Sequence, residues 1–205
     1  MARDTSPITK ISRREGVPLH RKAHKIMIKR TAPPGQHGAG RFKKQSNYGL
    51  QLREKQKVKR MYGLLEKQFR RLITEASKEK GQTGATLIQL LERRLDNVVF
   101  RAGFAPSRRA ARQLVSHGHF TVNGNRVDIP SIRVSKGDVI AARDKSKKSF
   151  YFTNIDDVIG EIESEPISWL ATDRKKFIIK VTGLPLREEA DDHINEQLIV
   201  EYYSR

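Results

Sequence analysis

Residues 86–124 read TLIQLLERRLDNVVFRAGFAPSRRAARQLVSHGHFTVNG and determine the fold of the centre of the chain. The leucines recur at helical spacing, and Thr86 opens a capping-box pattern, so we expect a helix from Thr86 that ends near Gly103. A second helix should begin at Ser107, because serine is a favoured N-cap residue. Gly118 is placed to cap the C-terminus of that helix.

Short strands should follow these two helices. Asn123-Gly124 is the strongest two-residue signal for a type I′ turn, since both central residues of that turn need positive φ. The expected strands are residues 120–122, 126–127, 132–134 and 139–141. Two helices followed by short antiparallel strands predict a small α+β module over residues 88–150.

The segments on either side have different characters. Upstream, residues 50–77 predict one long amphipathic helix with basic faces. Residues 1–45 are basic and rich in Pro and Gly, and alone they should be disordered, because they cannot bury enough apolar surface to fold. Downstream, an acidic helical stretch is expected at residues 156–165 and a strand at residues 177–181.

Paired carboxylates near the C-terminus allow two interpretations. Glu188-Glu189 and Asp191-Asp192 suggest a metal site. The simpler interpretation is the acidic first turn of a polar helix that closes the chain, because a helix dipole favours negative charge at that end.

The charge is large, positive and uneven. The formal net charge is +18 and the pI is about 10.3. Residues 1–60 hold 17 Lys and Arg against 3 Asp and Glu, and residues 61–150 hold 18 against 8, whereas residues 151–205 hold 6 against 12. A domain pI above about 9 is typical of a nucleic-acid-binding protein. We therefore expect a polyanion to meet the first three quarters of the chain, and the acidic quarter to face protein.

Several function classes are disfavoured. The chain has no cysteine, which excludes disulfides and thiolate zinc sites and fits a reducing cytoplasm. No apolar run approaches the roughly 20 residues that span a bilayer. His20, His24 and His37 lack thiolate neighbours and fit RNA contact or solvent better than metal binding. We expect neither a metal nor another cofactor.

Arginines and a hairpin tip form the expected binding face. The second helix presents Arg108, Arg109 and Arg112, whose guanidinium groups can bind phosphate bidentately and stack on bases. Asn123 and Arg126 lie at the hairpin, where a side chain can reach a groove. Double-stranded RNA is recognised mostly through its shape, phosphates and 2′-hydroxyls, so this face need not read sequence.

Short motifs run through residues 91–140. They are LERRLDNVV (91–99), RAGFA (101–105), ARQLVSHGH (111–119), VNG (122–124) and GDVI (137–140). Together they resemble the RNA-binding domain named after the fourth small-subunit ribosomal protein. That domain occurs in several families, so it implies RNA binding alone.

Motifs outside that domain narrow the resemblance. They are PGQHG (34–38), YGLQLREKQK (48–57) and INEQLIVEYYS (194–204). These are similar to the family of the fourth protein of the bacterial small ribosomal subunit. Some members of that family bind zinc through four cysteines, and this chain is identified as a cysteine-free variant.

The resemblance implies a fold and a location. A basic extension (1–45) should precede a helical domain (46–88) that the C-terminal segment (184–205) completes. An RNA-binding domain (89–183, core 91–150) should be inserted between them. The implied location is the cytoplasmic ribosome.

The resemblance also implies a role. The chain should bind small-subunit ribosomal RNA at a helical junction of the 5′ domain, early in assembly. The residues expected to bind it are Arg13, Arg14, Arg53, Lys55, Lys57, Arg60, Arg70, Arg94, Arg108, Arg109, Arg112, Asn123 and Arg126. Arg41, Lys43 and Lys44 are expected near the path along which messenger RNA enters, with an effect on translational accuracy. The acidic C-terminal part should contact the fifth small-subunit protein.

Two other functions were weighed. Arg94-Leu95-Asp96 resembles the triplet that carries the catalytic aspartate of pseudouridine synthases, but here it falls inside an amphipathic helix, where Asp96 is better explained as the partner of an arginine. A stand-alone RNA chaperone or translational repressor is the second alternative, and co-sedimentation with small subunits would distinguish it.

Overall fold

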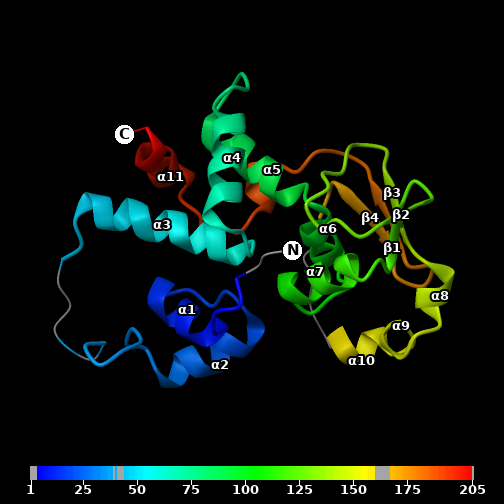
Figure 1. Cartoon of the computed structure of the whole chain (residues 1–205), viewed down its shortest axis with the longest axis horizontal. Coiled ribbons are helices and arrows are strands. Elements are labelled where there is room, and N and C mark those ends of the chain that lie inside the picture. The colour runs from blue at the N-terminus through cyan, green and yellow to red at the C-terminus, as the bar shows by residue number, and fades with distance from the viewer. Residues whose placement is uncertain (1–3, 39, 41–43, 160–166, 205) are drawn as a thin grey trace. The chain divides into compact units, whose positions relative to one another are not determined.

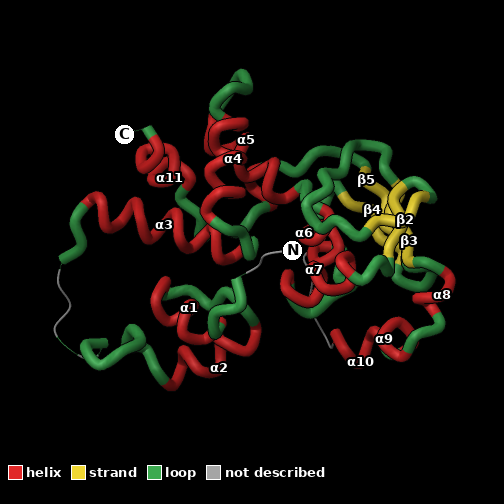
Figure 2. Tube along the Cα trace, in the orientation of Figure 1, coloured by secondary structure: helices red, strands yellow, loops and turns green. Residues whose placement is uncertain are grey.

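The computed structural model describes residues 4–38, 40, 44–159 and 167–204. The chain divides into two compact units (Figure 1). Unit 1 comprises Met1–Leu87 and Asp192–Arg205, and unit 2 comprises Ile88–Asp191. Helices dominate unit 1, whereas unit 2 combines helices with one antiparallel sheet, as the colours of Figure 2 show. The expected α+β class is confirmed, while the finer domain boundaries stay a prediction.

The basic N-terminal segment contains two helices, so the expectation of disorder is not what the structure shows. Helix α1 (Ile8–Glu15) ends at Gly16, whose φ of 73° terminates it, and α2 (Arg21–Lys29) packs against α1. The buried Ile11 and Ala23 supply a small apolar contact. A few well-placed apolar side chains therefore suffice once α3 lies against α1.

The single helix expected at residues 50–77 is two helices, α3 (Asn47–Met61) and α4 (Glu66–Ala76). Gly63 has φ 64° and donates to the carbonyl of Arg60, while Leu64 donates to the carbonyl of Lys59. These two bonds form a Schellman motif, which ends a helix at a left-handed glycine. The final helix, α11 (Glu196–Tyr203), packs along α3 (Figure 1).

The helix expected from Thr86 to Gly103 is also broken. Helix α5 (Thr83–Glu92) starts before Thr86, so the capping box is wrong, and α6 (Leu95–Arg101) follows after a break. At the break, Leu95 donates to the carbonyl of Ile132, and Arg94 forms a β-bridge with Arg133. These long-range bonds pair backbone groups at the break that are outside both helices' own hydrogen bonding. They also explain why residues 132–134 form no strand of the sheet.

Helix α7 (Arg108–Ser116) begins and ends as the sequence predicts. The Ser107 hydroxyl accepts a hydrogen bond from the Ala110 amide at 3.2 Å. Gly118 has φ 69° and donates to the carbonyl of Val115, which closes the C-terminus. Both caps are confirmed.

The sheet of unit 2 has five strands in the order β2-β1-β3-β5-β4, all antiparallel. The strands are β1 (Phe120–Val122), β2 (Asn125–Val127), β3 (Val139–Ala142), β4 (Leu170–Asp173) and β5 (Ile178–Val181). Asn123 (φ 50°) and Gly124 (φ 82°) form the expected turn between β1 and β2. Buried side chains of α6 and α7 pack with Phe120, Ile140 and Ile179 in one core.

The described residues between β3 and β4 include three short helices. They are α8 (Asp144–Lys147), α9 (Phe150–Thr153) and α10 (Ile155–Ile159). Part of the acidic stretch expected at residues 156–165 is therefore helical, and the rest lies outside the described residues. The strand expected at residues 177–181 is confirmed as β5.

The paired carboxylates near the C-terminus do not open the closing helix. Glu188 and Glu189 belong to a short 3-10 helix, η1 (Arg187–Glu189). Helix α11 starts later, where the Asn195 side chain accepts from the Leu198 amide at 3.4 Å. The helix-dipole interpretation was therefore wrong for these residues.

Candidate nucleic-acid interface

Two arginines of α7 bond to carboxylates of unit 2. The Arg108 guanidinium donates to Asp191 Oδ2 at 2.9 Å, and Arg112 donates to Asp96 Oδ2 at 3.2 Å. Both arginine side chains are largely covered, whereas Arg109 between them is exposed. The three arginines therefore share one helix but differ in how far they reach solvent.

Arg94 and Asp96 form a buried, bidentate ion pair. Arg94 Nε donates to Asp96 Oδ1 at 3.0 Å, and Arg94 Nη2 donates to Oδ2 at 2.7 Å. Arg94 is only 5% exposed. Asp96 is thus the partner of two arginines, as the sequence interpretation proposed, and not an open acid or base. The Arg94 side chain holds the fold at the break between α5 and α6.

Glu92 is a second buried carboxylate in the same region. It accepts from Asn97 Nδ2 at 2.8 Å, and Arg101 donates to both of its oxygens at 3.0 Å. Arg108 donates to Asn97 Oδ1 and stacks over the Phe100 ring at 4.8 Å. These bonds fix several guanidinium groups in place and neutralise part of the charge that the sequence assigned to RNA.

The hairpin carries two exposed polar side chains, of which Asn123 is hydrogen-bonded within the protein. Asn123 donates to Asp138 Oδ1 at 2.8 Å and accepts from the Val139 amide at 2.9 Å. Its amide therefore ties the turn to β3. Arg126 on β2 is exposed and passes close to Gly118, where an added Cβ would lie 2.8 Å from Arg126 Nε. Gly118 thus leaves room for that guanidinium beside the end of α7.

In unit 1, Glu15 lies between two of the predicted RNA-binding arginines. Arg53 donates to Glu15 Oε1 at 3.2 Å, and Arg60 also bonds to that oxygen. The carboxylate is fully covered, and burial raises the pKa of Glu15 against the opposing pull of both arginines. This contact joins α1 to α3.

Two lysines of α3 also have protein partners. Lys55 is buried, donates to Glu66 Oε1 at 2.8 Å and lies 4.7 Å from the centre of the Tyr202 ring. Lys57 pairs with Glu54 at 2.8 Å and bonds to the carbonyl of His193. Both lysines therefore connect α3 to the closing segment, a role that the spacing of charges alone does not reveal.

Helix α4 and the turn after it carry a group of exposed cations in unit 1. Arg70 lines a shallow groove of about 470 Å³ together with Lys67, Arg71 and Lys78. All four side chains are exposed. The residues predicted to contact RNA include Arg70 but not Lys67, Arg71 or Lys78, although Lys67 and Arg71 lie four residues apart on α4 and therefore share a face.

The basic residues of the N-terminal segment also differ in their surroundings. Arg13 Nη2 donates to the carbonyl of Ala32 at 2.7 Å, which ties α1 to the chain after α2, whereas Arg14 is exposed. Lys44, expected near messenger RNA, is also exposed. Arg41 and Lys43 lie outside the described residues.

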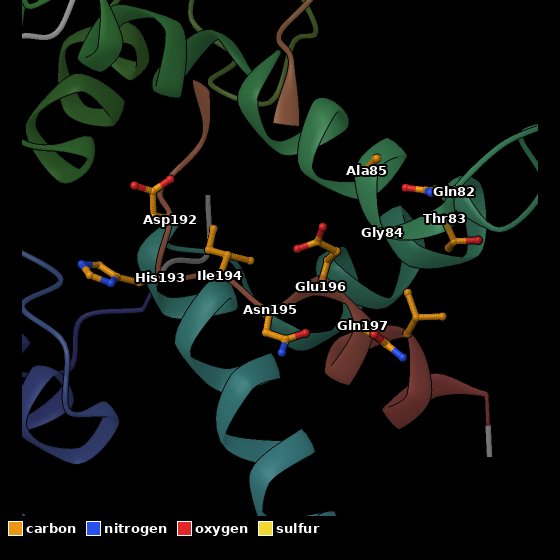
Figure 3. A pocket seen from close by; sticks show the side chains of 11 residues that line it. Gln82, Thr83, Gly84, Ala85, Asp192, His193, Ile194, Asn195, Glu196 and Gln197 are labelled. Atoms are coloured by element: carbon orange, nitrogen blue, oxygen red, sulfur yellow. The ribbon is translucent and has the colours of Figure 1, made fainter. Parts of the chain in front are cut away.

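A polar hollow of about 620 Å³ lies within unit 1, between the start of α5 and the start of α11 (Figure 3). Glu196 lies so close to Gly84 that an added Cβ would come within 2.5 Å of Glu196 Cγ. Amide side chains of Gln82, Asn195 and Gln197 line much of the rest. Asp192 and His193 line the hollow as well, so it combines amides with titratable side chains.

The described residues contain no group of three potential metal ligands. The His20 side chain instead accepts from the Lys22 amide at 3.0 Å and caps α2, while His24 and His37 are exposed. No helix among the described residues has the length and apolar character that a bilayer crossing requires.

Comparisons with known proteins agree with this geometry. Residues 3–92 match the family described as ribosomal protein S4/S9 N-terminal domain, and residues 93–140 match the S4 domain. The small ribosomal subunit protein uS4 of Herpetosiphon aurantiacus is 54% identical over 211 residues, and that of Clostridioides difficile is 52% identical over 211 residues. The uS4 of Chloroflexus aurantiacus is 51% identical over 206 residues. Each comparison covers 100% of both chains.

Proposed function

The chain belongs to the uS4 family of small ribosomal subunit proteins, and on that premise we propose that it binds a helical junction in the 5′ domain of small-subunit ribosomal RNA early in assembly. It is a structural, RNA-binding component of the cytoplasmic ribosome and not an enzyme. The ion pairs of Asp96 fit this role. Asp96 is the carboxylate that would have to act as the catalytic aspartate of a pseudouridine synthase, and here it is bonded to two arginines.

The observation that carries the proposal is the difference in solvent exposure among the basic residues. Arg94, Arg108 and Arg112 bond to carboxylates, and so they shape the α6–α7 face. Arg109 on α7 and Arg126 on β2 are exposed. A rigid frame with exposed guanidinium groups suits phosphate contacts, because little side-chain and backbone freedom is lost on binding.

Unit 1 contributes a second proposed surface. Arg70 lines a groove with the exposed cations Lys67, Arg71 and Lys78, and Arg14 lies exposed on α1. Arg13, Arg53, Lys55, Lys57, Arg60 and Asn123 remain proposed contact residues, each of which also bonds within the protein. We place Lys44, with Arg41 and Lys43, beside incoming messenger RNA, where their charge would influence translational accuracy.

Footprinting tests the RNA proposal. The full-length chain should be bound to its own small-subunit ribosomal RNA, alone and with the other early-binding proteins. Protection of a junction in the 5′ domain by the chain alone is expected. Protection that appears only after other proteins have bound would contradict early assembly, and protection confined to another domain would contradict the proposed site.

The acidic quarter supports a protein contact. Residues 151–205 hold twice as many Asp and Glu as Lys and Arg, which repels phosphate and suits a basic surface. We propose that this quarter contacts the neighbouring fifth small-subunit protein. Binding of the purified fifth protein should weaken when Glu188, exposed on η1, is replaced by lysine. Unchanged binding of Glu188→Lys would place the contact elsewhere.

A further inference from the structure

Three consecutive aromatic residues on α9 face different surroundings. Phe152 is buried, with its ring centre 6.0 Å from that of Phe120 and 5.5 Å from that of Phe177. The Tyr151 hydroxyl donates to the carbonyl of Phe104 at 2.9 Å. These two side chains fasten α9 to the core of unit 2.

Phe150, the first of the three, is 80% exposed. A single exposed apolar residue is ordinary on a protein surface and needs no explanation by itself. Phe150 differs because its backbone is held by two anchored neighbours, so the ring is presented from a fixed support. A ring on a fixed support loses little freedom when a ligand covers it.

Lysines precede Phe150 in the chain, in helix α8 and directly after it. Lys145 and Lys148 are exposed, and Lys147 pairs with Asp144 at 3.0 Å. Lys148 is two residues from Phe150, so their Cα atoms lie no more than about 7.6 Å apart. Residues 143–150 hold four Lys and Arg against one Asp. The acidic side chains of α10, Asp156 and Asp157, follow later in the chain.

We propose that Phe150 is a stacking platform for an unpaired base of RNA, with Lys145 and Lys148 contacting the phosphates on either side. Proteins that recognise unstacked bases place them on exposed aromatic rings beside cationic side chains. A lone ring among lysines suits a base next to phosphates better than an apolar protein groove, which would need a wider apolar patch. This inference rests on the proposed binding of small-subunit ribosomal RNA and adds a contact to it.

Equilibrium binding of the full-length chain to a transcript of its own small-subunit 5′ domain tests the proposal. Because one base–aromatic stack is lost, the dissociation constant of Phe150→Ala should be higher than that of the wild type by roughly 5- to 150-fold. Phe150→Leu keeps apolar bulk without a π-face and should bind as weakly, whereas Phe150→Trp should restore most of the affinity. Chemical modification should show one unpaired base protected by the wild type and open with Phe150→Ala.

Leu186→Ala is the matched control, because Leu186 is a 60% exposed apolar residue of unit 2 outside this lysine cluster. It should bind as tightly as the wild type. If the wild type binds the transcript and either Phe150→Ala or Phe150→Leu binds it equally tightly, the stacking proposal is wrong while the proposed function stands. Weaker incorporation into subunits with unchanged RNA affinity would assign Phe150 to a protein partner instead. A wild type that fails to bind the transcript would overturn the proposed function, and this inference with it.

Discussion

Arg94 and Asp96 are two residues apart in the chain and share two hydrogen bonds, of 3.0 and 2.7 Å, in the interior of unit 2. The pair lies where the chain leaves α5 and enters α6. Arg112 reaches the same carboxylate from α7. Asp96 therefore connects α6 to the break after α5 and to α7. Its removal would leave the charges of Arg94 and Arg112 without this carboxylate.

Replacing Asp96 should destabilise unit 2 strongly. Removal of one partner of a buried ion pair leaves an uncompensated charge and typically costs about 3–5 kcal/mol. Asp96→Asn keeps the size of the side chain and removes only the charge. Urea unfolding should show this loss for Asp96→Asn, whereas Asp128→Asn, at an exposed carboxylate, should stay within about 0.5 kcal/mol of the wild type. Equal stability of the two variants would show that the pair contributes little.

Elements specified by neighbouring residues were predictable from the sequence. Ser107 caps α7, Gly118 ends it, and Asn123-Gly124 makes the turn, because each signal acts within a few residues. The break at Arg94 was not predictable in this way, since its backbone pairs with residues about forty positions later. β4 was missed because Leu170–Asp173 has no clear apolar alternation.

The candidate interface was predictable by residue type but not by role. The sequence selects Arg108, Arg109 and Arg112 equally. Only the tertiary fold brings Asp191 and Asp96 to the first and last of them and leaves Arg109 exposed. The partners come from segments far apart in the chain, so the spacing of charges cannot separate arginines that hold the fold from those that face solvent.

Gly63 should resist substitution although space around it is open. Its φ of 64° lies in the left-handed region, and no heavy atom lies within 4 Å of an added Cβ. An alanine there should cost about 1–2 kcal/mol through backbone strain alone. Gly49→Ala, inside α3 and without positive φ, should instead stabilise by up to about 1 kcal/mol. Thermal unfolding of both variants checks the opposite signs, and a shift of the same sign for both would contradict the prediction.

Because of Glu66, the stability of unit 1 should depend on pH in the acid range. Partial burial raises its pKa, but hydrogen bonds from Lys55, Lys59 and Tyr203 outweigh burial and lower the pKa to about 2 from an ordinary 4.5. The folded-state pKa is below the unfolded one, so the stabilisation is present above pH 4.5 and is lost as the pH falls towards about 2.

Urea midpoints measured through that pH range check the effect. The loss of stability should be shallower in Glu66→Gln than in the wild type, while Glu79→Gln, at an exposed residue, should follow the wild type. The side chain of Glu66 is nearly half exposed, so solvent screening should keep the difference modest. Parallel curves for the wild type and Glu66→Gln would show that this carboxylate is not responsible.

Arg109 and Arg126 should contribute to RNA affinity. They are exposed, whereas Arg108 and Arg112 also hold carboxylates, so replacing the latter pair would mix loss of binding with loss of fold. Each phosphate contact removed from a duplex should reduce the steepness of log K against log salt by about 0.9. Arg109→Ala with Arg126→Ala should therefore weaken binding to the 5′-domain transcript and flatten its salt dependence by up to about 2. The unfolding midpoint of the same variant, measured in parallel, separates loss of binding from loss of fold. Lys180→Ala removes an exposed cation from β5 and should change affinity much less. If Lys180→Ala flattens the salt dependence as much per charge as the arginine variants, the effect comes from net charge and not from this face.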